Sequence, residues 1–152
     1  DIIWMINDVE CNDIEKKARL IAKYNKKYVI THNLGILDRS EYLDKENAID
    51  EICSFINDKR DILVKNGVNE NNIYFDVGFG FGKKTDTAIH LLKNIETIKN
   101  QLGLKTLVGH SRKASILGLD KSSNIVELDN ATRELSKKLQ IQNIEIIRIH
   151  RI

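Results

Sequence analysis

The chain lacks the features that define several common classes of protein. Its 152 residues carry 24 lysines and arginines against 22 aspartates and glutamates, and these are spread without a basic stripe, so we expect no nucleic-acid partner. Cys11 and Cys53 have no paired spacing, which argues against a disulfide framework or a zinc site and predicts two buried thiols in a reducing compartment. No apolar run reaches membrane-spanning length and no segment resembles a signal peptide, so we predict a cytoplasmic protein without a membrane partner.

Signatures of several catalytic classes are missing too. The four histidines have no HExxH spacing, and Ser111 has no His–Asp partner visible in the sequence, so neither a metal centre nor acyl transfer is favoured. A glycine-rich stretch covers residues 78–82, but a Walker loop needs two glycines with four residues between them and then Lys followed by Ser or Thr. Here three residues separate Gly78 from Gly82, and Lys83 is followed by another lysine, so this loop is not a nucleotide phosphate cradle.

What the sequence does contain is a repeated alternation of two patterns. Short apolar runs predict strands at 2–6, 28–30, 73–75, 106–108 and 144–149. Amphipathic periodicity predicts helices between them, one capped by Asp13, one ending near Gly67, one running from Ala88 to Gly103 and one around 128–139. Five strands alternating with four helices indicate an α/β fold of parallel βα units, forming a single domain over residues 1–152.

Polar side chains follow each of the five predicted strands. In parallel βα folds, sites lie beyond the carboxyl ends of the strands, whether the sheet is open or closed into a barrel. Singly, each of these residues is explained as a helix cap, a solvated lysine or a satisfied core histidine. Together they predict a site, and they are Asn7, Asp8, Thr31, His32, Asn33, Asp76, Ser111, Arg112, Lys113, Arg148 and His150.

These residue types favour binding over covalent chemistry. The Asp76 carboxylate presents two acceptors, which match the paired N–H donors of a pterin or guanine ring, and a lysine can donate to the ring carbonyl. Arg148 and His150 are two apart in a predicted strand, so they point to the same side and form an anion site. The alternating Gly/Phe loop after Asp76 is either a turn pinned to the core or a wall of the pocket.

Three motifs in this order and spacing resemble dihydropteroate synthase, the sulfonamide-target enzyme of folate synthesis. They are DVGFGFGK at 76–83, GHSRK at 109–113 and IRIH at 147–150, and INDV at 6–9 and Thr31-His32 fit the earlier motifs of that family. The resemblance runs from the first residue to the last.

The resemblance implies a TIM barrel and a transferase that joins a dihydropterin methyl pyrophosphate to p-aminobenzoate and releases pyrophosphate. Departure of pyrophosphate produces a cation that the pterin stabilises. The arylamine then attacks this cation, so no protein nucleophile is needed. The implied site residues fall into three groups: Asn7, Asp76, Lys113 and Arg148 on the pterin, Arg148 and His150 on the pyrophosphate, and Gly80, Phe81, Ser111 and Arg112 on the aminobenzoate side, where sulfonamides compete.

Length is the largest departure from the family. A TIM barrel typically needs ~250 residues, and this chain resembles only strands four to eight. The first three strands are absent, and with them the family's Asn linked to Mg²⁺, so no metal ligand is expected in this chain. We therefore expect Asp1 not to be a natural start, and the partial barrel to be inactive and poorly soluble until another polypeptide completes it. A homodimer is possible for the complete enzyme.

Smaller departures concern the predicted pocket. Val77 replaces a usual proline, which loosens a turn, and Arg151 stands where an Asp usually follows the last His. Thr31, Asn33 and Ala114 replace two methionines and a serine, so we expect altered affinity for both substrates. Two alternatives stay open: a pterin-binding methyltransferase that passes a folate methyl group to a corrinoid protein, and a non-catalytic remnant barrel. The Ser-Arg-Lys and Arg-x-His motifs argue against the first.

Overall fold

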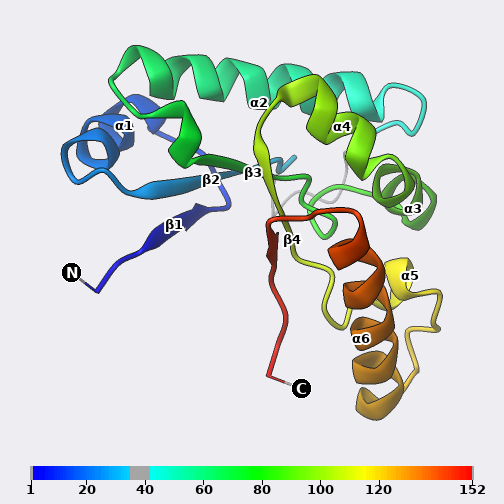
Figure 1. The fold of residues 1–152 in the computed structure, drawn as a ribbon. Helices are drawn as coiled ribbons and strands as arrows, with labels where there is room; N and C mark the ends of the chain where they lie inside the picture. The colour runs from blue at the N-terminus through cyan, green and yellow to red at the C-terminus, as the bar shows by residue number, and fades with distance from the viewer. Residues whose placement is uncertain (1, 35–41, 152) are drawn as a thin grey trace.

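The computed structural model of the chain describes residues 2–34 and 42–151. Five strands form one parallel sheet in chain order, β1 (Met5–Asp8), β2 (Lys27–Thr31), β3 (Ile73–Asp76), β4 (Lys105–Val108) and β5 (Ile146–Ile147). Helical segments connect them, namely α1 (Ile14–Lys23), α2 (Ala48–Lys65), the 3₁₀ turn η1 (Glu70–Asn72), α3 (Thr85–Lys93), α4 (Ile95–Leu102), α5 (Ala114–Leu117) and α6 (Ile125–Ile141). This confirms the predicted α/β fold of parallel units (Figure 1).

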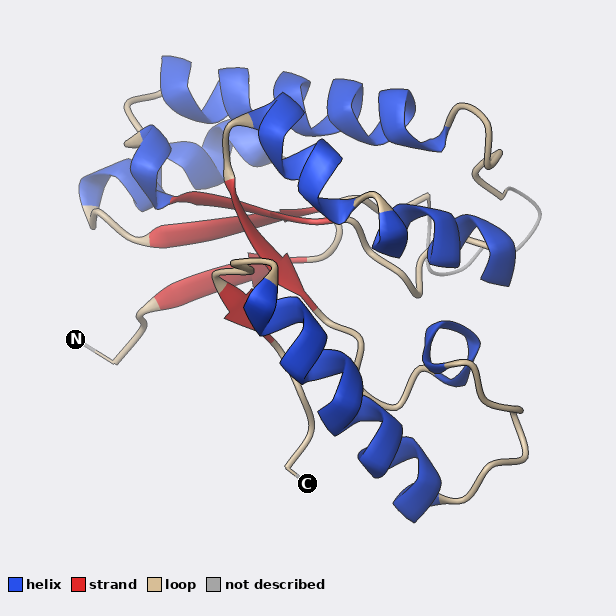
Figure 2. Cartoon of the chain, turned by 45° about the vertical axis from the view of Figure 1, so that its right-hand side comes forward, coloured by secondary structure: helices blue, strands red, loops and turns tan. Residues whose placement is uncertain are grey.

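The sheet separates two apolar layers. The helices pack on its outer face (Figure 2), where Tyr28, Ile30 and Phe75 belong to the main core. Because side chains alternate along a strand, the intervening residues point to the other face. There Val29, Tyr74 and Leu107 form a second, smaller cluster, against which Met5 and Ile146 pack. Within the described part of the chain, no helix is both long and apolar enough to cross a membrane.

Several predicted boundaries were wrong. The first strand begins at Met5, because pairing with β2 starts there, and the apolar residues before it are exposed. The last strand is shorter than predicted, although the Arg148 N–H still donates to the Val108 carbonyl at 2.9 Å. Helix α1 does begin directly after Asp13, as predicted, but Asp13 is in a left-handed conformation (φ 49°) and its side chain makes no capping hydrogen bond.

The helix predicted between Ala88 and Gly103 is two helices. The break lies at Asn94, whose side-chain Nδ2 donates to the His90 carbonyl at 2.8 Å. The apolar periodicity does not reveal this break, because one long helix and two shorter helices can bury the same apolar residues. With the short α5, the described residues contain six α-helices rather than the predicted four. The glycine stop at Gly103 is confirmed, with φ 63°.

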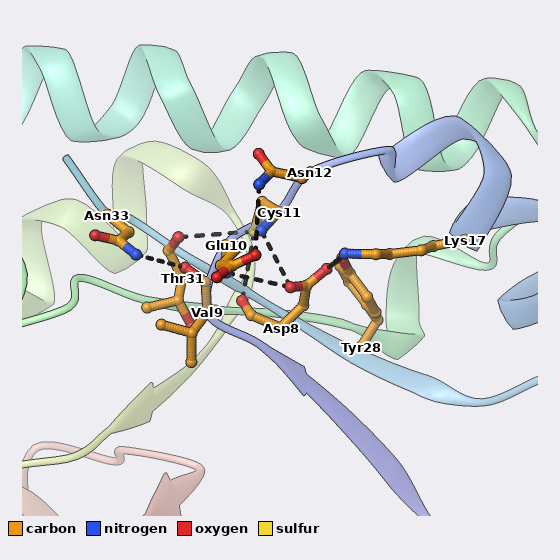
Figure 3. Close-up of polar contacts among 9 residues, drawn as sticks. All are labelled: Asp8, Val9, Glu10, Cys11, Asn12, Lys17, Tyr28, Thr31 and Asn33. Carbon is orange, nitrogen blue, oxygen red and sulfur yellow. Dashed lines mark hydrogen bonds and ion pairs between the residues drawn. The ribbon is translucent and has the colours of Figure 1, made fainter. Parts of the chain in front are cut away.

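Asp8 fixes the carboxyl end of β1 (Figure 3). One oxygen, Oδ1, accepts from the backbone N–H groups of Glu10 and Cys11 at 3.2 and 3.1 Å. The other accepts from Lys17 Nζ at 2.5 Å and from the Tyr28 hydroxyl. Burial raises the pKa of Asp8, but the hydrogen bonds from Lys17 and Tyr28 outweigh it and leave the pKa below its usual value. Asp8 therefore joins β1 to α1 and β2.

The loop after β3 is packed directly on the end of β2. Gly78 has φ +67°, and a Cβ added there would lie only 2.1 Å from the His32 carbonyl oxygen. The His32 N–H in turn donates to the Asp76 carbonyl at 2.9 Å. Position 78 therefore requires glycine both for its dihedral angle and for the space beside His32.

Gly78→Ala tests this packing against Gly118→Ala. Gly118 has nearly the same dihedral (φ +71°), but nothing lies within 4 Å of its added Cβ. We expect Gly118→Ala to cost about 1 kcal/mol in free energy of unfolding, from the left-handed backbone alone. Gly78→Ala adds a backbone clash and should cost at least about 2 kcal/mol more. Urea unfolding of both variants measures the difference, and equal losses would contradict the packing described here.

Candidate functional site

Asp76 is a buried carboxylate near three cationic side chains of the candidate site. It ends β3 and is 1% exposed. Its Oδ1 accepts from the Gly78 N–H at 2.8 Å, and its Oδ2 lies 3.4 Å from an Arg148 guanidinium nitrogen. Burial raises the pKa of Asp76, while the Gly78 N–H and the charges of Arg148, Lys113 and Lys83 act to lower it. The Arg148 contact is long, so among residues 2–34 and 42–151 Oδ2 has no close strong donor.

A cavity of about 350 Å³ lies at the carboxyl ends of β4 and β5. Its lining consists of Gly109, Ser111, Lys113, Arg148, Ile149 and His150. A Cβ at Gly109 would lie 2.6 Å from the Arg148 guanidinium, so the glycine leaves the space through which Arg148 reaches Asp76. The structure therefore brings together the anion-binding and lysine positions expected from the sequence.

Ser111 and His150 are paired in this cavity. The backbone N–H of His150 donates to Ser111 Oγ at 3.1 Å, and Nδ1 of the His150 ring lies 3.0 Å from the same oxygen. If the Ser111 hydroxyl donates to Nδ1, the ring carries its proton on Nε2, where it can donate to a bound anion. The two residues are 39 positions apart, so their pairing could not be seen in the sequence, which showed no partner for Ser111.

Arg112 points away from the cavity, toward α6. Its guanidinium makes two hydrogen bonds to Asp129, at 2.7 and 3.1 Å. Its backbone N–H donates to Thr132 Oγ1 at 3.1 Å, and its φ of 56° is left-handed. The neighbouring His110 is buried and makes contacts from Nε2 to the Thr132 carbonyl and to Ser136 Oγ. Of the Ser-Arg-Lys segment, only Ser111 and Lys113 line the cavity.

Lys113 lies across the Gly/Phe loop. Its Cε is 3.6 Å from where a Gly80 Cβ would be, and its Nζ is 6.0 Å from the centre of the Phe79 ring. Burial lowers the pKa of Lys113, Asp76 raises it and Arg148 lowers it further. Phe79 belongs to the main core, whereas Gly80 is exposed and Phe81 is half-buried. Phe79 therefore pins the loop to the core, whereas the interpretation of the loop as a wall of the pocket stays a prediction, since neither Gly80 nor Phe81 lines the cavity.

Asn7 lies on the inner face of the sheet but outside this cavity. Its register partner is Val29, and Met5, two residues before it, packs on the inner apolar cluster. The Asn7 side chain is exposed. Thr31 is the register partner of Asp76 and is buried, and its Oγ1 has no hydrogen-bond partner among the described residues. Asn33 instead donates to the Val9 carbonyl at 3.1 Å.

One residue of the site was missed by sequence reasoning. The Lys83 ammonium donates to the Phe81 carbonyl at 3.0 Å and to the His32 carbonyl at 3.3 Å, and lies 2.9 Å from His32 Nδ1. Burial lowers the pKa of Lys83 to about 7 and that of His32 to about 3. The only available signal was a lysine closing a glycine-rich loop, a pattern that usually indicates a solvated side chain.

No set of three or more His, Cys, Asp and Glu side chains within 2–34 and 42–151 is placed to hold a metal ion.

Comparison with known proteins identifies the family. A model of the pterin-binding enzymes matches residues 3–150, so the chain belongs to that family. Dihydropteroate synthase from Streptococcus pyogenes serotype M6 is 31% identical over 132 residues, which cover 86% of this chain and 47% of that protein. Dihydropteroate synthase type-1 from Escherichia coli is 33% identical over 117 residues, covering 74% and 42%. The chain thus spans about half the length of the curated relatives it matches.

Solved structures show the same relationship. Dihydropteroate synthase from Anaplasma phagocytophilum with bound 6-hydroxymethylpterin-monophosphate has a TM-score of 0.88 and 30% identity, over 99% of this chain and 59% of that one. The Xanthomonas albilineans synthase with 4-aminobenzoic acid has a TM-score of 0.81 and 25% identity, over 96% and 51%. The resemblance to dihydropteroate synthases is confirmed, and the five-stranded sheet is part of a TIM barrel.

His32 should make the fold sensitive to acid. Its pKa is about 3 in the folded chain and near 6.5 when unfolded, so between these values the unfolded chain binds more protons and stability falls as the pH falls. Between pH 7 and pH 5 this group should remove about 2 kcal/mol from the free energy of unfolding. Asp76, whose pKa is raised, acts in the opposite direction.

Urea unfolding of wild type and His32→Gln at pH 7 and pH 5 isolates this contribution. His110, whose pKa burial also lowers, is present in both chains and cancels. The variant should lose about 2 kcal/mol less than wild type on acidification. The same pH dependence in both chains would show that His32 is protonated in the folded state.

Proposed function

We propose that the chain supplies strands four to eight of a dihydropteroate synthase, which condenses a 7,8-dihydropterin methyl pyrophosphate with p-aminobenzoate to give dihydropteroate and pyrophosphate. The observation that carries this proposal is the buried Asp76 carboxylate with Arg148 and Lys113 beside it, in a chain of the pterin-binding family. The activity belongs to the completed barrel, and the 152-residue chain by itself is inactive.

Asp76 binds the pterin ring. Its Oδ2, whose contact within the described residues is the long one to Arg148, accepts from one ring N–H group, and its Oδ1 accepts from a second as well as from the Gly78 N–H. Lys113 donates to the ring carbonyl, and Arg148 lies against the ring face over Gly109. Asn7 adds an amide from the inner face of β1. The bound pterin monophosphate of the Anaplasma phagocytophilum structure supports a pterin site in this fold.

Arg148 and His150 bind the pyrophosphate. Both line the cavity, and the Ser111 hydroxyl holds the imidazole so that Nε2 is available to donate. As the carbon–oxygen bond to pyrophosphate breaks, negative charge grows on the leaving group, and the guanidinium and imidazole stabilise it. The arylamine then attacks the pterin cation and loses a proton. Positioning and electrostatics carry this reaction without a protein nucleophile.

The aminobenzoate lies on the side of Gly80, Phe81 and Ser111, and sulfonamides compete for the same place. The structure of the Xanthomonas albilineans synthase with 4-aminobenzoic acid supports a site for this substrate in the fold. Arg112 contributes indirectly, because its bond to Asp129 fixes the loop that carries Ser111 and Lys113. Mg²⁺, which the family resemblance implies, would be held by the Asn of the family's first strand, outside strands four to eight.

Asp76→Asn tests the pterin site. With 6-hydroxymethylpterin monophosphate as the probe, calorimetry on the chain fused to the amino-terminal half of the Streptococcus pyogenes synthase should show a loss of about 2 to 5 kcal/mol in binding free energy. Asp61→Asn, whose carboxylate is exposed on α2, is the matched control and should bind as wild type does. Unchanged affinity in Asp76→Asn removes this residue from the site.

The dependence on a completed barrel is tested separately by turnover. Dihydropteroate formation is measured for the 152-residue chain and for the same fusion. We expect no turnover from the chain by itself and measurable turnover from the fusion. Robust turnover by the isolated chain would overturn the first expectation, and a folded fusion that binds no pterin would indicate a non-catalytic remnant.

A further inference from the structure

Lys83 connects the Gly/Phe loop, residues 77–82, to the end of β2. Its three contacts, to the Phe81 carbonyl, the His32 carbonyl and His32 Nδ1, match the three N–H donors of an ammonium group. Two of the acceptors belong to the end of β2 and one to the loop itself. The same loop packs on the His32 carbonyl through Gly78, and Lys113 crosses it at Gly80. Lys83 and Lys113 therefore both contact the loop, and only Lys113 lines the cavity.

The protonation state of His32 follows from its surroundings. The ring is 3% exposed and lies edge-on against Phe55, with ring centres 5.0 Å apart. Burial keeps its pKa near 3, so the imidazole is neutral at ordinary pH. A neutral ring with an ammonium 2.9 Å from Nδ1 must accept there, which places its own proton on Nε2.

The charged groups near Lys83 act in opposite directions. The Asp76 carboxylate favours the ammonium form, and the Lys113 ammonium disfavours it. Burial acts against the charge most strongly, so the pKa of Lys83 falls to about 7. Lys83 therefore titrates in a range where its neighbour His32 stays uncharged.

We propose that Lys83 and His32 form a coupled titrating pair that positions the Gly/Phe loop, residues 77–82. When Lys83 loses a proton, the His32 ring changes its tautomer. A neutral amine has two N–H donors and one lone pair, so it can still bond both carbonyls, and its lone pair then faces Nδ1. The contact is kept only if the ring proton moves from Nε2 to Nδ1 and donates to the amine. One proton in total is released to solvent.

This pair makes Lys83 a positioning residue, because it touches Phe81 and His32 and none of the cavity-lining groups. Its effect falls on Phe81, whose carbonyl it binds, more than on Asp76, whose Oδ1 is fixed by the Gly78 N–H. That the loop serves the aminobenzoate side rests on the proposed function. The coupled titration itself does not.

Nitrogen NMR of the histidine rings in the full chain tests the pair without any ligand. Two-bond ¹H–¹⁵N correlations distinguish the two neutral tautomers and the imidazolium, and His32→Gln assigns the signals. Between pH 5.5 and pH 9 we expect His32 to stay neutral and to change from the Nε2–H to the Nδ1–H tautomer with a midpoint near the pKa of Lys83, about 7. An unchanged tautomer, or an imidazolium signal, overturns the proposal.

Variants separate this pair from a merely structural contact. Lys83→Arg keeps a positive charge at every pH tested, so His32 should stay in the Nε2–H tautomer throughout. Lys83→Met removes the donors and should abolish the transition near pH 7; if it does not fold, the arginine variant decides. Lys84→Met, at the adjacent exposed position, should keep the wild-type midpoint. A transition retained in Lys83→Arg overturns the proposal.

Failure of this experiment and failure of the proposed function are distinguishable. If the chain shows the tautomer change but the completed barrel binds no pterin monophosphate, the Lys83–His32 pair is supported and the synthase assignment is overturned. If the completed barrel binds pterin through Asp76 but His32 shows no tautomer change, the synthase assignment is supported and the Lys83–His32 pair is overturned.

Discussion

The removal of the Asp76 carboxylate from water is the constraint on which the rest of the site depends. A buried carboxylate is unfavourable unless donors and cations compensate for its lost hydration. Here the Gly78 N–H is the close donor, and three cations from different parts of the chain, Lys83, Lys113 and Arg148, contribute only through their charge or a long contact. The carboxylate is thus held in place but incompletely satisfied, which is consistent with the pterin-binding role proposed for it.

Two of the cationic side chains cross the backbone at glycines, which have no side chain of their own. Arg148 passes over Gly109 and Lys113 over Gly80, while Gly78 allows the loop to lie on the end of β2. The glycines of the two motifs therefore serve different purposes. Gly109 makes room for the Arg148 side chain, Gly80 is only in ordinary contact range of Lys113, and Gly78 satisfies a left-handed dihedral angle and a close backbone contact.

The periodicity of the sequence was sufficient to predict the parallel sheet and the edge at which the site lies, because both depend on local burial patterns. The pairing of Ser111 with His150 and the turn of Arg112 toward Asp129 were not predictable, since each joins residues far apart in the chain. The helix break at Asn94 depends on one side-chain hydrogen bond that periodicity does not record. The roles assigned to individual residues, Asn7 among them, came from family resemblance and stay predictions.

The attachment of Arg112 to α6 extends the site beyond the residues that line it. Ser111 and Lys113 flank an arginine whose side chain and backbone are both bound to that helix, through Asp129 and Thr132. A shift of α6 along its axis would therefore move the Ser111 hydroxyl and the Lys113 ammonium, which both line the cavity, together. Asp129 and Thr132 do not line the cavity themselves, yet substitutions at either position would displace both groups.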